Sequence, residues 1–290
     1  MITITTRFAM QQQADRWRAQ GNTIALVPTM GALHQGHLAL VERAKAEADM
    51  VVVSIFVNPT QFAPGEDYDR YPRMPERDAE LLRPLGVDVF FAPSAGELYP
   101  FGIDEVYTEV RVKGLTDQLC GAHREGHFLG VTTVVTKLLL ACKPHIAVFG
   151  LKDAQQYFVL RRMVGELGFD VELIGVPTVR EPDGLAMSSR NVYLLDGERA
   201  HASVIAKSID RTKDDILAGE LELGPLVRRL AQQIAGAGGN VQYADVVETR
   251  TLTPVGTATP GQQLLIAVAA FFGTTRLIDN AIVTVPDTVV

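Results

Sequence analysis

The sequence predicts an α/β protein, with a Rossmann-like doubly wound parallel sheet followed by a smaller α+β carboxyl-terminal domain. Short β-branched runs at 24–27 and 50–57 flank a helical pattern, which is the order of a strand–helix–strand unit. Later apolar runs at 87–91, 145–149 and 170–176 are also typical of buried strands. After residue 185 the pattern changes to helical segments and then three longer strand-like runs. We therefore expect domains at residues 1–185 and 186–290.

Composition limits the class of protein. The chain has 290 residues, of which 47% are hydrophobic and 21% charged, and this is typical of a globular protein with a large core. Its net charge of −7 argues against a general nucleic-acid binder or a protein that binds anionic membranes. Two cysteines, Cys120 and Cys142, are too few for a disulfide framework. With no signal-peptide pattern and no membrane-spanning run, we expect a cytoplasmic protein.

The first elements follow from apolar spacing. Residues 8–20 have a helical look and end at a glycine turn, and residues 24–27 form the first buried strand. Pro28 is expected to stop that strand, with residues 29–31 making a turn. From Leu38 onward, apolar residues recur every three or four positions, which predicts a helix.

The turn before this helix carries His34-Gln35-Gly36-His37. Two histidines three residues apart at a helix start lie on one face, and Gly36 removes a side chain where a ligand comes close. The helix N-terminus adds unpaired backbone N–H groups and a positive dipole end, which together suit a phosphate chain. A metal-binding pair, or two ordinary surface histidines, are the alternatives.

Amides follow the second strand. Asn58 comes directly after it and Gln61 lies three residues further on. Because ligands bind at the carboxyl ends of parallel strands, we expect both amides to face the same site as the histidines. Asn58-Pro59 is also a common turn pair, which is an alternative explanation for Asn58. The loop at 63–75 is expected to cover the site as a flap.

A possible metal site lies further along. Cys120, His123 and His127 have a spacing that would supply three zinc ligands, but no fourth ligand or second cysteine pair is close in the sequence. The alternative is a loop before a buried helix at 131–141. Tyr107 to Val112 alternates and predicts a further extended segment.

Two further segments suit anion binding. After the strand at 145–149, Lys152 follows Gly150 at a helix start, where its ammonium can meet phosphate oxygens. Asp153 there serves equally well as an N-cap. Residues 187–190, Met-Ser-Ser-Arg, offer two hydroxyls and a guanidinium as phosphate donors. This tetrapeptide alone is a weak signal.

The carboxyl-terminal part reads as helices and then strands. Residues 197–236 carry two helical patterns, expected to be broken at Gly219 and at Gly224-Pro225. Strand-like runs follow at 241–247, 263–271 and 275–283.

These motifs resemble those of the pantothenate synthetase (pantoate–β-alanine ligase) family, which belongs to the nucleotidyltransferases with an H-x-G-H motif. The matching segments, in chain order, are V-P-T-M-G-A-L-H-Q-G-H at 27–37, F-V-N-P-T-Q-F at 56–62, R-E-G-H-F-L-G-V at 124–131, F-G-L-K-D-A-Q-Q at 149–156 and M-S-S-R at 187–190. The last resembles a variant of the Lys-Met-Ser-Lys-Ser loop of ATP-using relatives. Leu151 departs from the acid that many members carry before the lysine.

The resemblance implies ATP-dependent condensation of (R)-pantoate with β-alanine through a pantoyl adenylate, with Mg²⁺ on the triphosphate, a carboxyl-terminal lid domain and a homodimer. It implies His37, as proton donor, with His34, Lys152 and Arg190 as the catalytic set. Contacts to ATP are implied for Met30, Gly31, Ala32, Leu33, His34, Gln35, Gly36, His37, Gly150, Leu151, Lys152, Asp153, Val179, Met187, Ser188, Ser189 and Arg190. Contacts to pantoate or β-alanine are implied for Thr29, Met30, Asn58, Gln61, Arg124 and Gln156.

Two other functions stay open at this point. An adenylyltransferase acting on a mononucleotide would keep the H-x-G-H motif but has no use for the amides of Asn58, Gln61 and Gln156. A non-catalytic nucleotide- or zinc-binding module is the second alternative. Bound zinc without ATP turnover would favour it.

Overall fold

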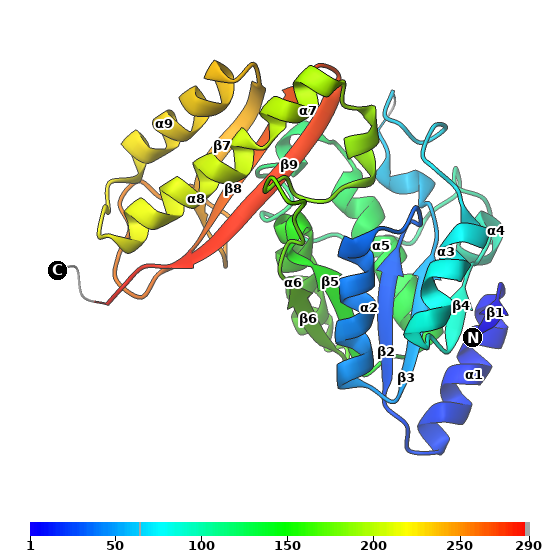
Figure 1. Cartoon of the computed structure of the whole chain (residues 1–290). Coiled ribbons are helices and arrows are strands. Elements are labelled where there is room, and N and C mark those ends of the chain that lie inside the picture. The colour runs from blue at the N-terminus through cyan, green and yellow to red at the C-terminus, as the bar shows by residue number, and fades with distance from the viewer. Residues whose placement is uncertain (64, 288–290) are drawn as a thin grey trace. The chain divides into compact units, whose positions relative to one another are not determined.

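Six short runs of mainly β-branched and aromatic residues form one parallel sheet in the order β1-β4-β3-β2-β5-β6 (Figure 1). The computed structural model describes residues 1–63 and 65–287. Its first six strands are β1 (Ile2–Ile4), β2 (Ile24–Thr29), β3 (Met50–Ile55), β4 (Val89–Phe91), β5 (Ile146–Gly150) and β6 (Glu172–Val176). The predicted α/β class with a parallel sheet is confirmed. The strand β1 was not foreseen, because three residues are too few to show an alternating pattern.

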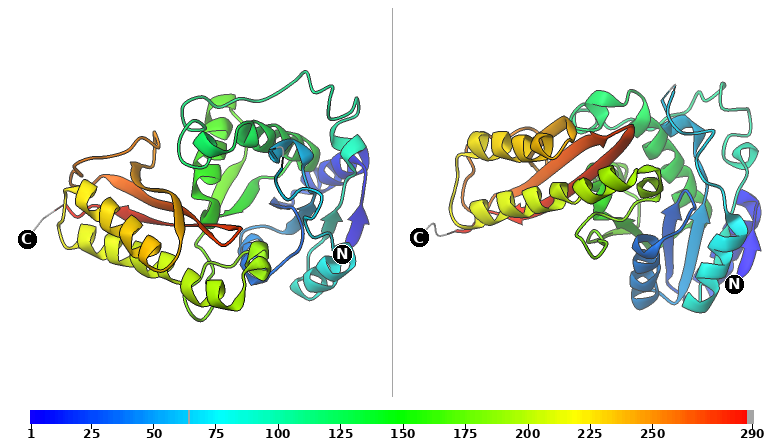
Figure 2. Two further views of the ribbon diagram at one scale, coloured as in Figure 1. Left: turned by 90° about the horizontal axis from the view of Figure 1, so that it is seen from above. Right: turned by 45° about the horizontal axis from the view of Figure 1, so that its top comes forward.

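Helices cover both faces of this sheet, as a parallel sheet requires. On one face lie α2 (Gln35–Glu47) and α3 (Pro75–Leu82), whose buried side chains share a core with β2, β3 and β4. On the other face, α1 (Arg7–Ala19) and α5 (His127–Cys142) pack against each other and against β2, as the view from above shows (Figure 2). The helix α5 is apolar nearly all round and mostly buried. It begins four residues before the predicted start.

The carboxyl ends of β2, β3 and β5 lie at one edge of the sheet, because these strands are parallel and adjacent. The segment after β2 is the turn that opens α2. The segment after β3 contains the short 3₁₀ helix η1 (Pro59–Gln61), and the segment after β5 is the 3₁₀ helix η4 (Leu151–Asp153), which leads into α6 (Ala154–Leu167). The motif segments therefore follow neighbouring strands.

The second sheet is antiparallel, in the order β7-β8-β9. Its strands are β7 (Asn240–Glu248), β8 (Gln263–Phe272) and β9 (Thr275–Thr284). Two amphipathic helices, α8 (Val204–Leu217) and α9 (Leu223–Gly236), bury their apolar faces against it in one core. Shorter helices are η2 (Arg83–Leu85), α4 (Ala95–Leu98), η3 (Gly121–His123), η5 (Ser189–Tyr193) and α7 (Asp196–Ala202).

The chain packs into two units that alternate along the sequence. The first unit holds residues 1–113, 124–151 and 159–177, and with them the whole parallel sheet. The second holds 114–123, 152–158 and the described residues from 178 onward. Lys152 thus belongs to the second unit although β5, which precedes it, belongs to the first. The division into folding domains at 1–185 and 186–290 stays a prediction.

Three local predictions were wrong. Pro28 lies inside β2, opposite Ser54 of β3. Phe56 N donates to Thr29 O, so the backbone polar groups of Thr29 point toward β3 and those of Pro28 point toward β5. The strand β5 pairs with β2 only at Ala25 and Leu26. The N–H that proline lacks therefore has no ladder partner to lose.

The other two concern 107–112 and the second helical break. Residues 107–112 form no strand, since Val110 bonds to the hydroxyls of Thr132 and Thr133 on α5 instead of to a strand edge. Gly224 and Pro225 lie in the first turn of α9, where proline is tolerated because its missing N–H has no helical partner there.

Candidate active site

The turn between β2 and α2 is held in an unusual backbone conformation. Gly31 has φ +86° and Ala32 has φ +50°, and the second value is uncommon for a residue with a side chain. The buried carboxylate of Asp78, on α3, accepts hydrogen bonds from Ala32 N at 3.0 Å and from Leu33 N at 2.8 Å. Burial raises the pKa of this carboxyl, and the two N–H bonds act in the opposite direction. Asp78 therefore fixes the backbone that leads into the histidines.

His34 and His37 lie together at the start of α2. His34 caps the helix by accepting from Gly36 N at 3.1 Å through Nδ1, and His37 Nδ1 accepts from His34 N at 3.3 Å. The two ring centroids are 4.1 Å apart. A ring nitrogen that accepts a hydrogen bond carries no proton, so each neutral ring is protonated on Nε2. The start of α2 thus presents two Nε2–H donors, one from each histidine, and the hydrogen bond at Nδ1 fixes the tautomer of each ring.

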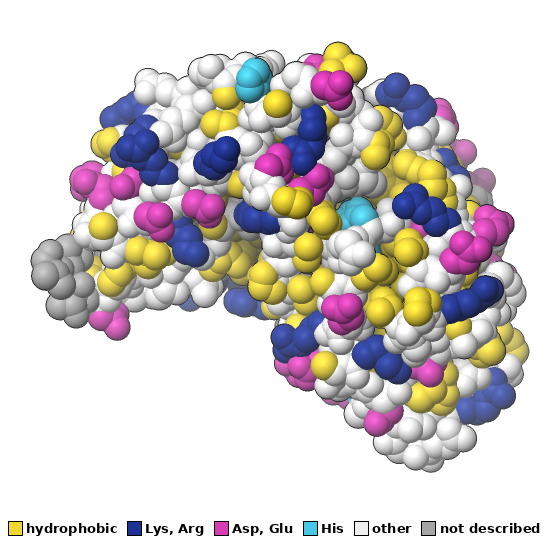
Figure 3. Space-filling model, in the orientation of Figure 1, with side chains coloured by type: hydrophobic (Ala, Val, Ile, Leu, Met, Phe, Trp, Pro, Cys, Tyr) yellow, Lys and Arg dark blue, Asp and Glu magenta, His cyan; other side chains and the backbone are white. Residues whose placement is uncertain are grey.

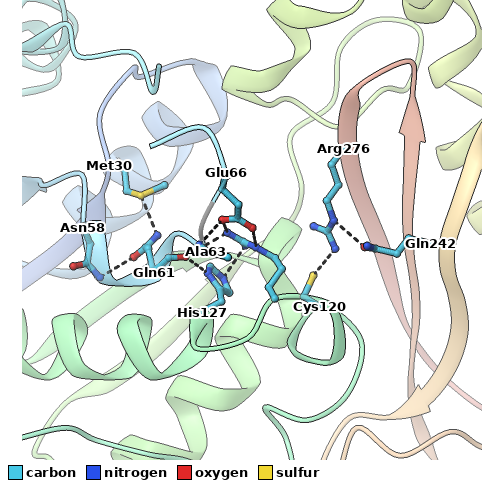
Figure 4. A network of polar contacts seen from close by, with 10 residues as sticks. Met30, Asn58, Gln61, Ala63, Glu66, Cys120, His127, Gln242 and Arg276 are labelled. Atoms are coloured by element: carbon cyan, nitrogen blue, oxygen red, sulfur yellow. Dashed lines mark hydrogen bonds and ion pairs between the residues drawn. The ribbon is translucent and has the colours of Figure 1, made fainter. Parts of the chain in front are cut away.

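The amides after β3 form a connected set with Met30 (Figure 4). Gln61 is mostly buried, and its Nε2 lies 3.0 Å from the sulfur of Met30. Asn58 is 1% exposed and donates to Gln61 Oε1 at 3.2 Å and to Gly130 O at 3.2 Å. Its own oxygen accepts from the Tyr99 hydroxyl at 2.8 Å. Asn58 therefore bonds to protein groups and orients the side chain of Gln61.

The backbone of Gln61 is held from α5. His127 Nδ1 lies 2.8 Å from Gln61 O (Figure 4). Arg124 Nη1 lies 3.0 Å from His127 Nε2. Arg124 also forms a two-pronged ion pair with Glu66, with both N–O distances 2.7 Å. Burial alone would raise the pKa of Glu66, but the hydrogen bonds and charge of Arg124 outweigh this and lower it. With its guanidinium engaged in this way, direct contact of Arg124 with a ligand stays a prediction.

In the second unit, the two glutamines after Lys152 have different surroundings. Gln155 is buried and bonds to Leu115 O, Gln118 O and Cys120 N at 2.7–2.9 Å. It therefore holds the loop at 115–120. Gln156 is half-buried, and its contact with pantoate stays a prediction.

The Met187–Arg190 segment leaves a small hairpin. Its arms are joined by a bridge between Arg180 and Ala186, and Met187 N donates to Val179 O at 3.0 Å. Ser188 then caps η5 by accepting from Arg190 N at 3.2 Å. The segment thus has a defined backbone rather than that of an open loop.

The predicted residues divide between the two units. The first unit holds Thr29, Met30, His34, His37, Asn58, Gln61 and Arg124, in which His34 contacts His37, and Gln61 contacts Met30, Asn58 and Arg124. The second holds Lys152, Asp153, Gln156, Val179 and residues 187–190. The donors in both are imidazole, amide, ammonium, hydroxyl and guanidinium groups, which suit phosphate and carboxylate oxygens.

Sequence reasoning missed the residues that support these donors, above all Asp78, Glu66 and Tyr99. One signal was available for Asp78. It lies four residues before Leu82 on α3, and both are buried, so a carboxylate occupies the apolar face of an amphipathic helix.

The zinc alternative finds little support. His123 stacks on Tyr243, whereas His127 bonds to Gln61 O. Within residues 1–63 and 65–287, no group of three or more His, Cys, Asp or Glu side chains is arranged to hold a metal ion.

In the same part of the chain, no helix is long and apolar enough to span a membrane. On the face shown in Figure 3, acidic and basic side chains are intermixed.

Known proteins resemble this chain along nearly its full length. A family model described as pantoate-beta-alanine ligase matches residues 2–282. A pantothenate synthetase of Salinibacter ruber is 57% identical over 291 residues, covering 99% of each chain. The crystal structure of the Thermus thermophilus pantothenate synthetase has a TM-score of 0.89 at 45% identity and covers 97% of this chain and 99% of that one. A Francisella tularensis pantoate-beta-alanine ligase, complexed with beta-gamma ATP and beta-alanine, has a TM-score of 0.79 at 34% identity and covers 97% of each.

Proposed function

The chain belongs to the pantoate–β-alanine ligase family and condenses pantoate with β-alanine, and we propose that it does so through a pantoyl adenylate formed from ATP. A carboxylate is a poor electrophile with a poor leaving group, and adenylation corrects both faults. An oxygen of the pantoate carboxylate attacks the α-phosphorus, and the bond to pyrophosphate breaks. The amine of β-alanine then attacks the acyl carbon, AMP leaves with the bridging oxygen, and the amine loses a proton.

The His34–His37 pair is the observation that carries this proposal. Both rings accept a backbone N–H through Nδ1, so both have Nε2–H donors at the start of a helix. Such fixed donors favour the charge that builds up on a transferring phosphoryl group. We assign to His37, which the resemblance implies as proton donor, an Nε2–H hydrogen bond to the departing pyrophosphate. Lys152 and the Ser188–Arg190 segment add donors to phosphate oxygens.

The pantoate contacts are assigned to neutral amides. Gln61, oriented by Asn58, and Gln156 would donate to the hydroxyl and carboxylate oxygens of pantoate. Met30 contacts Gln61, and we propose that it and Thr29, the residue before it, also contact pantoate. We propose that Asn58 and Arg124 act through Gln61, since Asn58 bonds to its side chain and Arg124 contacts its carbonyl.

Mg²⁺ fits this site through the nucleotide. Apart from Asp153, the assigned polar side chains carry nitrogen or hydroxyl groups rather than carboxylates, and Mg²⁺ prefers oxygen ligands with several waters. The triphosphate would supply those oxygens, and the ion would neutralise charge on the leaving pyrophosphate. We further propose a homodimer in the cytoplasm, where Cys120 and Cys142 would stay reduced, in keeping with their unpaired state here.

Pyrophosphate release tests the proposal. The protein is incubated with ATP and Mg²⁺, with and without pantoate, and β-alanine is added afterwards. We expect pyrophosphate only when pantoate is present, and AMP and pantothenate after β-alanine is added. His37→Ala and Lys152→Ala should each slow pyrophosphate release by about 10²–10³-fold, the usual loss when one donor to a transition-state anion is removed.

The opposite result has a clear meaning. If ATP binds but pantoate causes no pyrophosphate release, the adenylate route is wrong for this chain. Mononucleotide acceptors would then be tested in the same assay.

A further inference from the structure

Two consecutive residues of β9 each bond to a different segment of the proposed phosphate-binding set. Asp279 bonds to Arg180, in the hairpin before Met187, and Asn280 bonds to the backbone of Lys152. We propose that Asp279 and Asn280 are positioning residues, which hold the Lys152 turn and the Met187–Arg190 segment at a fixed spacing for the adenylation step. This inference rests on the roles proposed above for those two segments.

The contact of Asp279 is a buried two-pronged ion pair. Arg180 Nη1 lies 2.6 Å from one carboxylate oxygen of Asp279, and Nη2 lies 3.1 Å from the other. The Asp279 side chain is only 3% exposed. Burial tends to lower the pKa of Arg180, but the hydrogen bonds and charge of Asp279 outweigh this and raise it. The guanidinium therefore stays charged, and its two parallel N–H···O bonds to Asp279 fix the geometry of the contact.

Arg180 also bonds to the hairpin that precedes Met187. Its Nη1 also donates to Gly184 O at 3.0 Å, across the hairpin whose arms meet at Arg180 and Ala186. Asn191, just beyond the phosphate-binding segment, donates to Ala186 O at 3.1 Å. The segment from Met187 to Arg190 is thus fastened at both ends to a hairpin that Asp279 anchors.

Asn280 bonds to the backbone of the segment that contains Lys152. Its Nδ2 donates to Lys152 O at 2.8 Å, and the residue is 9% exposed. Lys152 lies in the 3₁₀ helix η4, whose single turn has few backbone bonds of its own. Asp279 Oδ1 also accepts from Asn280 N at 2.8 Å, which ties the two anchors together.

The strand itself is a rigid support. Asp279 pairs with Val268 and Asn280 with Ala267 in the β8–β9 ladder. Neighbouring strand residues are about 3.3 Å apart along the strand, so the two anchors cannot drift independently. Donors that stabilise a developing charge are effective only if they are already in place. Loss of an anchor is therefore expected to slow adenylation more than it weakens ground-state binding of ATP.

The test uses a double-mutant cycle on pyrophosphate release. Asn280→Ala is expected to lower kcat for pyrophosphate release about tenfold, with the KM for ATP nearly unchanged. In a Lys152→Ala background the same substitution should have little further effect, because the ammonium that it positions is absent. A merely structural role would give the same loss in both backgrounds.

The matched control is Thr275→Val on the same strand. Thr275 is buried, and its hydroxyl has no hydrogen-bond partner within the described residues. This variant should keep wild-type kinetics. For Asp279, the isosteric Asp279→Asn variant is compared with Arg180→Met plus Asp279→Leu, which removes both charges. Both should lower kcat, and the double variant avoids leaving a buried charge unpaired.

The outcomes separate this inference from the proposed function. If Lys152→Ala leaves pyrophosphate release unchanged, the proposed role of Lys152 fails. If Lys152→Ala suppresses release but Asn280→Ala has no effect, or the same effect in both backgrounds, only the positioning role is overturned.

Discussion

Gln155 and Gln156 are consecutive residues whose side chains have different surroundings. The Gln155 amide bonds to three backbone groups of the loop at 115–120, whereas Gln156 is half-buried. Gln155 of this family motif thus bonds to the protein's own backbone. Asn58 is likewise buried and bonds to Gln61, Gly130 and Tyr99, and its contact with pantoate stays a prediction.

Substitution of each glutamine should separate binding from stability. Gln156→Ala is expected to raise the KM for pantoate about tenfold, the usual effect of losing one hydrogen bond to a charged ligand, with little change in Tm. Gln155→Ala should lower the free energy of unfolding by about 1–3 kcal/mol, because it leaves buried backbone groups unpaired. Steady-state kinetics and urea unfolding measure the two effects. An unchanged KM in Gln156→Ala would contradict the assignment.

The sequence predicted the residues whose position at the start of a helix indicates a function. It did not predict the residues that hold them in place. His34, His37 and Lys152 follow strands at the start of helices, and that position alone suggests anion binding. Asp78 lies 45 and 46 residues from the two backbone groups that it holds, and Glu66 lies 58 residues from Arg124. No local pattern encodes such a contact.

At the scale of elements, α5 packs unusually close to η1. A Cβ atom added at Gly130 would clash with Thr60 O and would lie 2.7 Å from Gln61 N. The close approach lets Gly130 O accept from Asn58 and brings His127 to Gln61 O. Glycine is required here by space, since its backbone conformation is an ordinary helical one.

Gly130→Ala should therefore displace η1. We expect it to cost about 1–3 kcal/mol of unfolding free energy, as overpacking usually does, and to raise the KM for pantoate by moving Gln61. Gly165→Ala in α6 is the matched control, because an added Cβ there meets nothing within 4 Å. This control should gain about 0.5–1 kcal/mol from better helix propensity. Equal effects of the two substitutions would refute the packing argument.

The ion pair between Glu66 and Arg124 joins the 63–75 segment to the start of α5. Because the folded-state pKa of Glu66 is lowered from its usual 4.5, the pair stabilises the fold above that pH. Its contribution is lost as the pH falls through the folded-state pKa. Both side chains are partly exposed, which limits the contribution to about 1 kcal/mol.

Glu66→Gln should accordingly be less stable than wild type at neutral pH by about that amount. The gap should begin to close below pH 4.5. Urea unfolding of both proteins across this pH range measures the gap. If the difference in unfolding free energy stayed constant or widened in acid, Glu66 would not stabilise the fold through this ion pair.

Element prediction succeeded where the apolar pattern was strong. The strands β7, β8 and β9 are nine or ten residues long, and their alternating or continuously apolar runs were visible in the sequence. Pro28 shows where local rules fail, because whether proline is tolerated in a strand depends on the partner on each side, and sequence alone does not give the strand order.

At the scale of the whole molecule, the fold class was predictable but the packing units were not. The turn containing Lys152 and the loop at 114–123 pack with the carboxyl-terminal sheet, although they lie within the amino-terminal half of the chain or near its middle. Gln155 and Asn280 make the contacts that place them there. These contacts join residues up to 128 positions apart, beyond the reach of any periodicity.

Activation of pantoate as an adenylate can be followed with pantoate labelled with ¹⁸O in both carboxylate oxygens. We expect one labelled oxygen in each AMP and one in each pantothenate, because the oxygen that attacks phosphorus leaves with AMP. Unlabelled AMP, or label released as inorganic phosphate together with ADP, would contradict it.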